Sequence, residues 1–246
     1  MTDYAELADD FYINMQLQTA LDLPQQRDAA THFFEQVQRR YPKMRTLVTR
    51  EKETFLEEDK ELRSYRWVSL DLRRISSGVV NPPEIDEAIA QHRQVLSVLP
   101  YSLAVSHLDC ESLNLVFGFD YTYRGNHNQL LIQTLGLPDA LQALADIPGA
   151  QCMGYEPSIQ ITLDPELRTQ CRISFETRST PSHIRSREYP DEQLSVYFAL
   201  RRIDSLQPGE SFEAEFDRLG ILGRRILDDY IVENVLQPLQ QAIALQ

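Results

Sequence analysis

Apolar and polar residues alternate near the start of the chain in the pattern of a half-buried strand. Phe11, Ile13 and Met15 are separated by polar side chains, which is the two-residue period of a strand with one buried face. After Pro24 the apolar positions recur every three or four residues, which predicts a helix that Pro42 ends. Strand-like segments are then expected near residues 43–50, 53–58 and 64–75.

The same succession of patterns recurs further along the chain. Pro82 and Pro83 introduce a second helix, which Pro100 is expected to end. Strands are expected at about 103–110 and 112–123, before a helix capped by Asn126 and a short helix at 138–146. Further strands are predicted near 157–163, 170–178 and 193–203, with a loop at 179–191. A long helix begins near Ser211, and Pro238 is expected to kink or break it near Asn234.

These patterns predict an α+β protein with one domain over residues 1–246. Its two halves, about 10–100 and 103–246, share the order strand, helix, three strands, helix, which suggests an internally duplicated unit. Joined edge to edge, the halves would form a large, curved, mostly antiparallel sheet with helices on one face. Because the halves share little residue identity, chance recurrence of the element order remains an open alternative.

Composition narrows the class of protein. Of 246 residues, 42% are hydrophobic, which supports a sizeable core. Asp and Glu exceed Lys and Arg by 37 to 24, a net charge of −13 that makes nucleic-acid binding an unfavourable hypothesis. There is no uninterrupted apolar run of the roughly 18 residues that a membrane helix needs, and the acidic start does not resemble a secretion signal. Three cysteines without a CxxC pair fit reduced thiols, so we expect a cytoplasmic protein.

The polar positions of the predicted strands would lie together on the sheet face that the helices leave open. Large aromatic and charged side chains gather there, and the candidate ligand-binding residues are Trp67, Asp71, Arg73, Asp120, Arg172, Glu176, Tyr197 and Arg201. One interpretation is a solvated face whose charges pair across strands, at about 0.2–1 kcal/mol per pair. The other is a binding surface on which guanidinium groups hold carboxylates or phosphates.

A second candidate site lies where a predicted strand meets the helix capped by Asn126. Tyr123, Arg124, Asn126 and His127 follow one another closely there. Free N–H groups at a helix start bind anions, and the arginine and histidine would assist. The alternative is a capped turn with flanking polar residues.

A third, weaker candidate is a metal site. His107, Asp109 and Glu111 would share one face of a strand and include side chains that bind divalent ions. The alternative is the polar edge of a strand. Cys110 would point to the other face as a core thiol, and His92 is expected to be a core histidine.

Sequence motifs of common enzymes are absent. The chain has no G-x-S-x-G, no Walker-type phosphate loop, no G-x-G-x-x-G and no H-E-x-x-H. We therefore expect no cofactor and favour a protein that is not an enzyme.

Two resemblances follow from these patterns. The duplicated strand-helix-strands-helix order looks like the TATA-binding-protein-like fold in architecture, without the positive charge that DNA binding needs. The opening strand, its helix and the Tyr41-Pro42-Lys43-Met44 exit are similar to a sporadically distributed family of uncharacterised bacterial proteins. That second resemblance covers the first fifth of the chain and implies no site residues.

The function expected from the sequence is a non-catalytic binding or assembly module that uses the polar sheet face. The alternative is a small-molecule enzyme or ligand-binding protein with its site near residues 123–127. The expected partners are a second copy of the chain, an unidentified protein or a small molecule. The apolar C-terminal segment at 231–245 would either pack in the core or mediate a homodimer.

Overall fold

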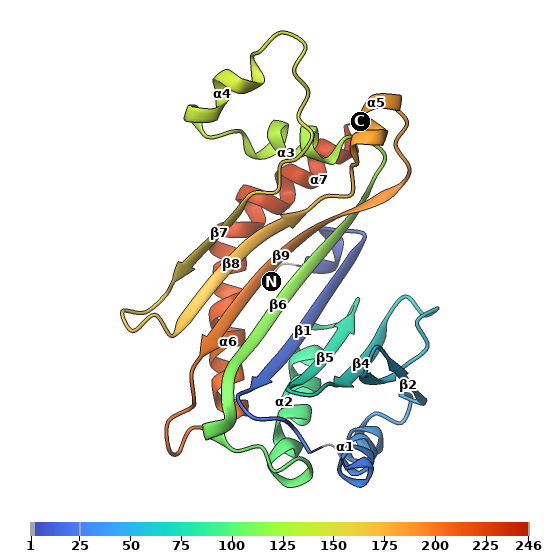
Figure 1. Cartoon of the computed structure of the whole chain (residues 1–246), viewed down its shortest axis with the longest axis vertical. Coiled ribbons are helices and arrows are strands. Elements are labelled where there is room, and N and C mark those ends of the chain that lie inside the picture. The colour runs from blue at the N-terminus through green and yellow to red at the C-terminus, as the bar shows by residue number, and fades with distance from the viewer. Residues whose placement is uncertain (1–2, 25, 246) are drawn as a thin grey trace.

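A computed structural model describes residues 3–24 and 26–245, and one antiparallel sheet dominates it (Figure 1). In this part of the chain the sheet has nine strands in the order β2-β3-β4-β5-β1-β6-β9-β8-β7. The strands are β1 (Asp10–Thr19), β2 (Thr46–Arg50), β3 (Glu53–Glu57), β4 (Tyr65–Leu70), β5 (Arg74–Val80), β6 (Cys110–Tyr123), β7 (Ser158–Thr162), β8 (Thr169–Glu176) and β9 (Glu192–Ile203). The protein is therefore α+β, as the sequence predicts.

The helices lie mainly behind the sheet in the view of Figure 1. They are α1 (Arg27–Arg40), α2 (Ile85–Ser102), α3 (His127–Leu135), α4 (Asp139–Ala145), α5 (Pro181–Ser186), α6 (Phe212–Ile226), the π-helical segment η3 (Leu227–Leu236) and α7 (Gln237–Ala244). Short 3-10 turns form η1 (Tyr4–Glu6) and η2 (His107–Asp109). No helix in the described residues combines the length and apolarity needed to cross a membrane.

The central strand β1 follows the predicted alternation along its whole length. Phe11, Ile13, Met15 and Leu17 are buried, and the side chains between them are half-buried. β1 pairs with β5 on one side and with β6 on the other, so the two halves of the chain share one sheet. The helices α2 and α6 pack against the buried face, while the opposite face is open.

Helix α6 packs closely on the strand pair β6–β9. Phe117 and Phe198 are opposite each other in the two strands, with ring centroids 6.1 Å apart and stacked rings. A Cβ added to Gly223 of α6 would lie 2.6 Å from Leu200 Cδ1 and 2.8 Å from Phe117 Cε2. The helix can approach the sheet this closely because position 223 has no side chain.

Replacing each of two glycines of α6 by alanine tests the close approach of α6 to the sheet. Alanine generally favours a helix over glycine by about 0.5–1 kcal/mol. We expect Gly220→Ala to stabilise by this amount, because its Cβ would meet only Ile89 Cδ1 at an ordinary 3.7 Å. Gly223→Ala is expected to lower the free energy of unfolding by about 1–3 kcal/mol through overpacking. Urea denaturation measures both, and equal effects would contradict the close approach.

The sequence patterns placed most elements correctly but mistook several boundaries. The segment 64–75 is not one strand: β4 ends at Leu70 and a turn leads into β5, which was missed. The first half consequently has four strands between its helices rather than three. The prediction of a strand at 103–110 is wrong, because the 3-10 turn η2 lies there. Pro100 does not end α2, which runs on to Ser102 with Pro100 inside it. The loop 179–191 contains the helix α5.

The C-terminal helical region does not break at Pro238. The missing N–H of Pro238 lies at the start of α7. The turns before it widen into the π-helix η3, so the helical path continues. Val232, Leu236 and Leu239 are buried. The core-packing interpretation of this segment is therefore confirmed for these three residues.

Candidate functional site

The open face of the sheet is floored by aromatic rings that lie over glycines. Trp67 in β4 is opposite Gly78 in β5, and a Cβ at Gly78 would lie 2.2 Å from the indole ring. Tyr12 in β1 is opposite Gly118 in β6, and the corresponding distance to its ring is 2.1 Å. Tyr197 continues the row, with its ring centroid 6.5 Å from that of Tyr12. Each ring rests on the sheet because a glycine leaves it room.

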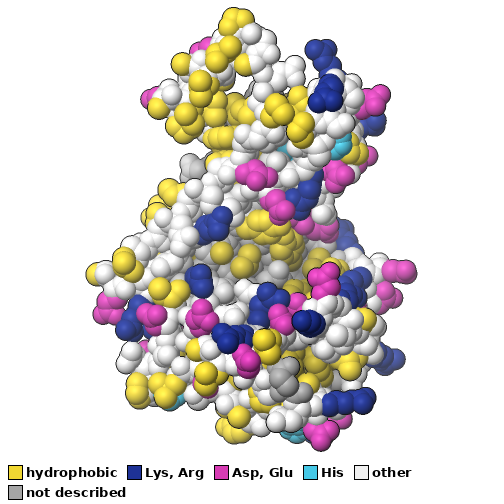
Figure 2. Space-filling view, in the orientation of Figure 1, with side chains coloured by type: hydrophobic (Ala, Val, Ile, Leu, Met, Phe, Trp, Pro, Cys, Tyr) yellow, Lys and Arg dark blue, Asp and Glu magenta, His cyan; other side chains and the backbone are white. Residues whose placement is uncertain are grey.

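A hollow of about 460 Å³ opens beside this floor, over β1, β6, β9, β8 and β7. Figure 2 views the open face and shows hydrophobic side chains in its hollowed centre with charged side chains around them. The polar residues that line the open-face hollow are Gln16, Gln18, Glu111, Ser112, Asn114, Gln160, Gln170, Arg172 and Arg201. Among the described residues lining it, Glu111 alone is acidic.

Arg172 and Arg201 are the two cations of the open-face hollow, and both are exposed. Arg172 donates to the Ser158 hydroxyl at 2.9 Å, and Arg201 donates to the Ser112 hydroxyl at 3.3 Å. Neither forms an ion pair with a carboxylate of the described residues. Elsewhere the acidic chain pairs many of its cations, namely Arg50, Lys60, Arg66, Arg73, Arg74, Arg93, Arg168, Arg178, Arg202, Arg218 and Arg224.

Amide side chains complete the polar lining. Asn114 donates to the Gln16 side chain at 3.4 Å, and Gln160 donates to the Gln170 side chain at 2.7 Å. These pairs join neighbouring strands and hold the amides across the surface of the hollow. The guanidinium groups keep most of their donor N–H groups for other partners, because each carries five.

The far end of the open face contains carboxylates with hydrogen-bond partners. Asp120 accepts a long hydrogen bond from Tyr12, at 3.4 Å, and lies opposite Asp10 in β1. Burial raises the pKa of Asp120, and the facing Asp10 adds to that rise. Glu176 forms an ion pair with Arg178 at 2.6 Å and accepts from the Tyr197 hydroxyl at 3.0 Å. At this end of the open face, Asp120 and Glu176 therefore already have partners within the protein.

Two candidates from the sequence do not lie on the sheet face. Asp71 and Arg73 are in the turn between β4 and β5, because β4 ends before them. Arg73 pairs with Asp22 at 2.6 Å, and Asp71 pairs with Arg74 at 3.3 Å. The prediction that Asp71 and Arg73 lie on the sheet face is therefore wrong. It arose because the alternation of apolar and polar residues continues into the turn that follows β4.

The residues at 123–127 have structural partners. Asn126 caps α3 by accepting from the backbone N–H of Asn128 and Gln129, at 3.0 and 3.3 Å. His127 is buried, with one ring nitrogen 3.2 Å from the Tyr123 carbonyl. The other accepts the backbone N–H of Arg178, also at 3.2 Å.

The environment of this junction follows from those bonds. Burial lowers the pKa of His127, although the Tyr123 carbonyl bond opposes that change. Arg124 reaches the Tyr189 carbonyl at 3.3 Å, and the Tyr123 ring lies 5.8 Å from the His127 ring. The junction thus joins α3 to the segments that follow β8.

The three metal-site candidates do not share a strand face, so that expectation is wrong. His107 and Asp109 are in the 3-10 turn η2, where Asp109 accepts from the backbone N–H and the hydroxyl of Ser106. Glu111 is in β6 at the open-face hollow. Across residues 3–24 and 26–245, no group of three or more His, Cys, Asp or Glu is arranged to hold a metal. Cys110 is a core thiol as predicted, and burial raises its pKa to about 12.

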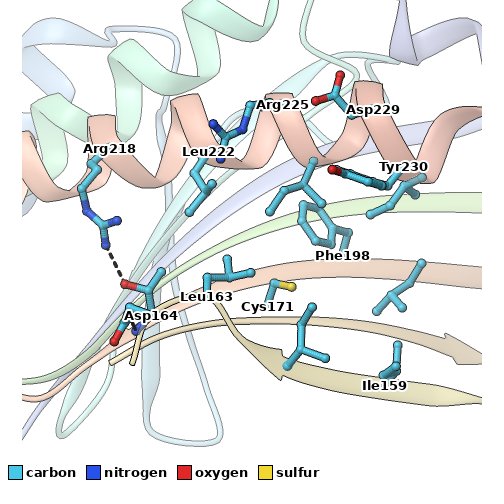
Figure 3. Close-up of a pocket in the computed structure, with 15 residues that line it drawn as sticks. Ile159, Leu163, Asp164, Cys171, Phe198, Arg218, Leu222, Arg225, Asp229 and Tyr230 are labelled. Carbon is cyan, nitrogen blue, oxygen red and sulfur yellow. Dashed lines mark hydrogen bonds between the residues drawn. The ribbon is translucent and has the colours of Figure 1, made fainter. Parts of the chain in front are cut away.

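A second concavity, which sequence reasoning missed, lies on the other side of the sheet. It has a volume of about 820 Å³ and separates β7 and β8 from α6 and η3 (Figure 3). Most of its lining is apolar, from Ile159, Ile161, Leu163, Cys171, Ile173, Phe198, Leu222, Ile226, Tyr230 and Ile231. We call it the β7–α6 groove. The sequence does not distinguish these residues from core residues, because they continue the apolar period of their own strands and helices.

No protein-family model matches the chain. No curated protein matches it.

Proposed function

We propose that this protein is a non-catalytic binding module that holds an anionic ligand in the open-face hollow. The ligand would carry carboxylate or phosphate groups. The observation that carries the proposal is the pair Arg172 and Arg201, which line one hollow and form no ion pair with the described residues. The lining of that hollow contains two guanidinium groups and one carboxylate, Glu111, so its own formal charge is positive although the chain carries a net charge of −13.

The chemistry of the lining supports an anion over a cation. A guanidinium group is planar and offers two parallel N–H donors to a carboxylate or a phosphate. The two arginines are on adjacent strands, with Arg172 opposite Ala199 and Arg201 opposite Gln170, so one ligand can contact both. The surrounding amides supply donors and acceptors for the neutral groups of such a ligand.

Apolar residues of the lining give the ligand a second kind of contact. Val116, Cys171 and Ala199 line the hollow beside its polar groups. Pockets that recognise small ligands combine apolar walls with a few placed polar groups, at volumes of about 300–1,000 Å³. The volume of about 460 Å³ lies within that range. We therefore propose recognition without a reaction step.

The proposal predicts that removing either guanidinium weakens anion binding. A hydrogen bond to a charged group contributes about 1.5–3 kcal/mol, so Arg172→Gln and Arg201→Gln should each weaken binding by about tenfold or more. Isothermal titration calorimetry with inorganic pyrophosphate and with citrate tests phosphate and carboxylate ligands separately. The matched control is Arg39→Gln, because Arg39 is an exposed arginine in α1, away from the hollow.

The calorimetry can support the proposal or contradict it. Binding of either anion by the wild type and the control, with the loss confined to the two hollow variants, supports the proposal. If the wild type binds neither anion, or if all three variants bind like the wild type, the proposal fails.

We also propose that the fold derives from a duplicated unit. Outward from the centre, the first half places β1, β5, β4 and β3, and the second places β6, β9, β8 and β7, in matching chain order. In each half a helix follows the first strand and another follows the last, as in the TATA-binding-protein-like architecture. The additional edge strand β2 and the helices α4 and α5 are departures from that correspondence.

A further inference from the structure

A projecting arm extends from the end of the molecule at which α3 begins. Residues 137–154, which include α4, form this arm (Figure 1). Its base is closed by Tyr155, whose hydroxyl donates to the Gly136 carbonyl at 2.6 Å and whose backbone N–H donates to Asn128 at 2.7 Å. The base is thus fixed to the body while the tip stands apart from it.

The arm exposes apolar side chains that nothing in the described chain covers. Every residue at positions 138–151 is exposed. Leu141, Leu144 and Ile147 retain 45–60% of their accessible surface, and Met153 retains 58%. A helix as short as α4 is marginal in water unless it packs against something, because helix nucleation is costly. An exposed apolar strip on such a helix is typical of a contact surface.

The β7–α6 groove presents the complementary surface. Ile159 and Ile161 of the edge strand β7 face into the groove and are 61% and 50% exposed, because the helix layer ends before reaching them. Figure 3 shows Leu222 and Tyr230 projecting from the helical side toward the strands that carry Cys171 and Ile159. The groove thus has apolar walls on both sides and no chain segment between them.

The arm is acidic, and one cation of the groove has no ion pair. The arm carries Asp139 and Asp146 and no lysine or arginine. The charged residues that line the groove are Arg218, Arg225, Asp164 and Asp229, so their formal charges balance. Arg218 is held by Glu215 at 2.7 Å, whereas Arg225 is exposed and forms no ion pair within the residues that the structure describes. The match between the arm and the groove is therefore mainly apolar, and Arg225 is the groove cation that an acid of the arm can reach.

We propose that the arm of a second copy of this chain occupies the β7–α6 groove. The arm and β7 are on the same flank of the molecule (Figure 1), so a twofold axis on that flank would allow reciprocal insertion. Each copy then covers the other's apolar groove, and Asp139 or Asp146 approaches Arg225. This interface is on the helical side of the sheet and does not use the open-face hollow.

The proposal predicts a dimer whose mass is twice the 28.5 kDa of one chain. Multi-angle light scattering over a range of concentrations measures it. Leu144→Asp in the arm and Ile159→Asp in the groove should each reduce the mass to that of one chain, because each places a carboxylate in an apolar contact. The matched control is Leu47→Asp at the opposite edge strand β2, where the residue is 59% exposed. Circular dichroism verifies that all three variants fold.

Mixing the two disruptive variants distinguishes arm-in-groove insertion from other interfaces. The Leu144→Asp chain keeps an intact groove, and the Ile159→Asp chain keeps an intact arm, so a mixture regains one complete contact. We expect dimers to reappear only in the mixture. A monomeric wild type, a dimer that survives either substitution, or a mixture that stays monomeric would each overturn the proposal. None of these outcomes depends on ligand binding in the open-face hollow.

Discussion

Replacing Phe117 by alanine is expected to lower the free energy of unfolding by about 3–5 kcal/mol. The ring is fully buried, stacks on Phe198 and lies against the backbone of α6 at Gly223. Removing it leaves a cavity between the sheet and the helix, because neighbours from three elements cannot all move into the space. Domains typically unfold at about 5–15 kcal/mol, so the loss is a large fraction of the total. Urea denaturation measures it directly.

Phe55 provides the matched control for this prediction. It is the same residue type in the same sheet, but it lies half-buried on the open face beside Trp67, at 6.3 Å between ring centroids. Phe55→Ala exposes mainly surface that water already reaches, so its loss should be clearly smaller. Equal losses at the two positions would contradict the assignment of the core to the helix-covered face.

Lowering the pH is expected to destabilise the protein through His92. The His92 ring is fully buried between α2, β1 and β5, and burial lowers its pKa from 6.5 to about 3. Its Nε2 is 3.2 Å from the Ile13 carbonyl and therefore carries the proton. Its Nδ1 accepts from the Ser77 hydroxyl at 3.0 Å, and Ser77 in turn accepts from Gln91 at 2.9 Å. The bonds fit a neutral imidazole.

The sign of the effect follows from proton binding. Between pH 6.5 and 3 the unfolded chain protonates this histidine while the folded chain does not, so the folded state loses stability as the pH falls. The limiting slope is about 1.4 kcal/mol per pH unit for this one group. Carboxylates such as Glu176, whose pKa the Arg178 guanidinium lowers, change stability in the same direction. The contribution of His92 must therefore be isolated by substitution.

Two measurements isolate the contribution of His92. Urea denaturation of wild type and His92→Gln from pH 7 to pH 4 should show a shallower pH dependence in the variant. NMR of the wild-type imidazole should show one neutral tautomer throughout the range in which exposed histidines titrate. A His92 ring that takes up a proton between pH 7 and pH 4 would refute the prediction, even if the variant does not fold.

The residues of the candidate site could be predicted in part from the sequence. Alternation along single strands correctly placed Trp67, Arg172, Tyr197 and Arg201 on the open face, because side chains two residues apart always share a face. It did not indicate that Arg172 and Arg201 share one hollow, since that depends on the register between β8 and β9. The groove and its relation to the arm were not predicted, because exposure of Ile159 depends on where a distant helix ends.

By itself, the sequence determined the local elements and their faces. The period of β1, the Asn126 cap and the stop at Pro42 each depend on neighbours a few residues away, so short-range patterns were sufficient. Only the tertiary structure decided that β5 is a strand, although Ser76, Ser77 and Gly78 weaken its pattern. Those small residues are buried because Trp67 covers Gly78 and Gln91 and His92 bond Ser77 from α2. Such contacts join positions that are far apart in the chain, so the local pattern of apolar and polar residues cannot indicate them.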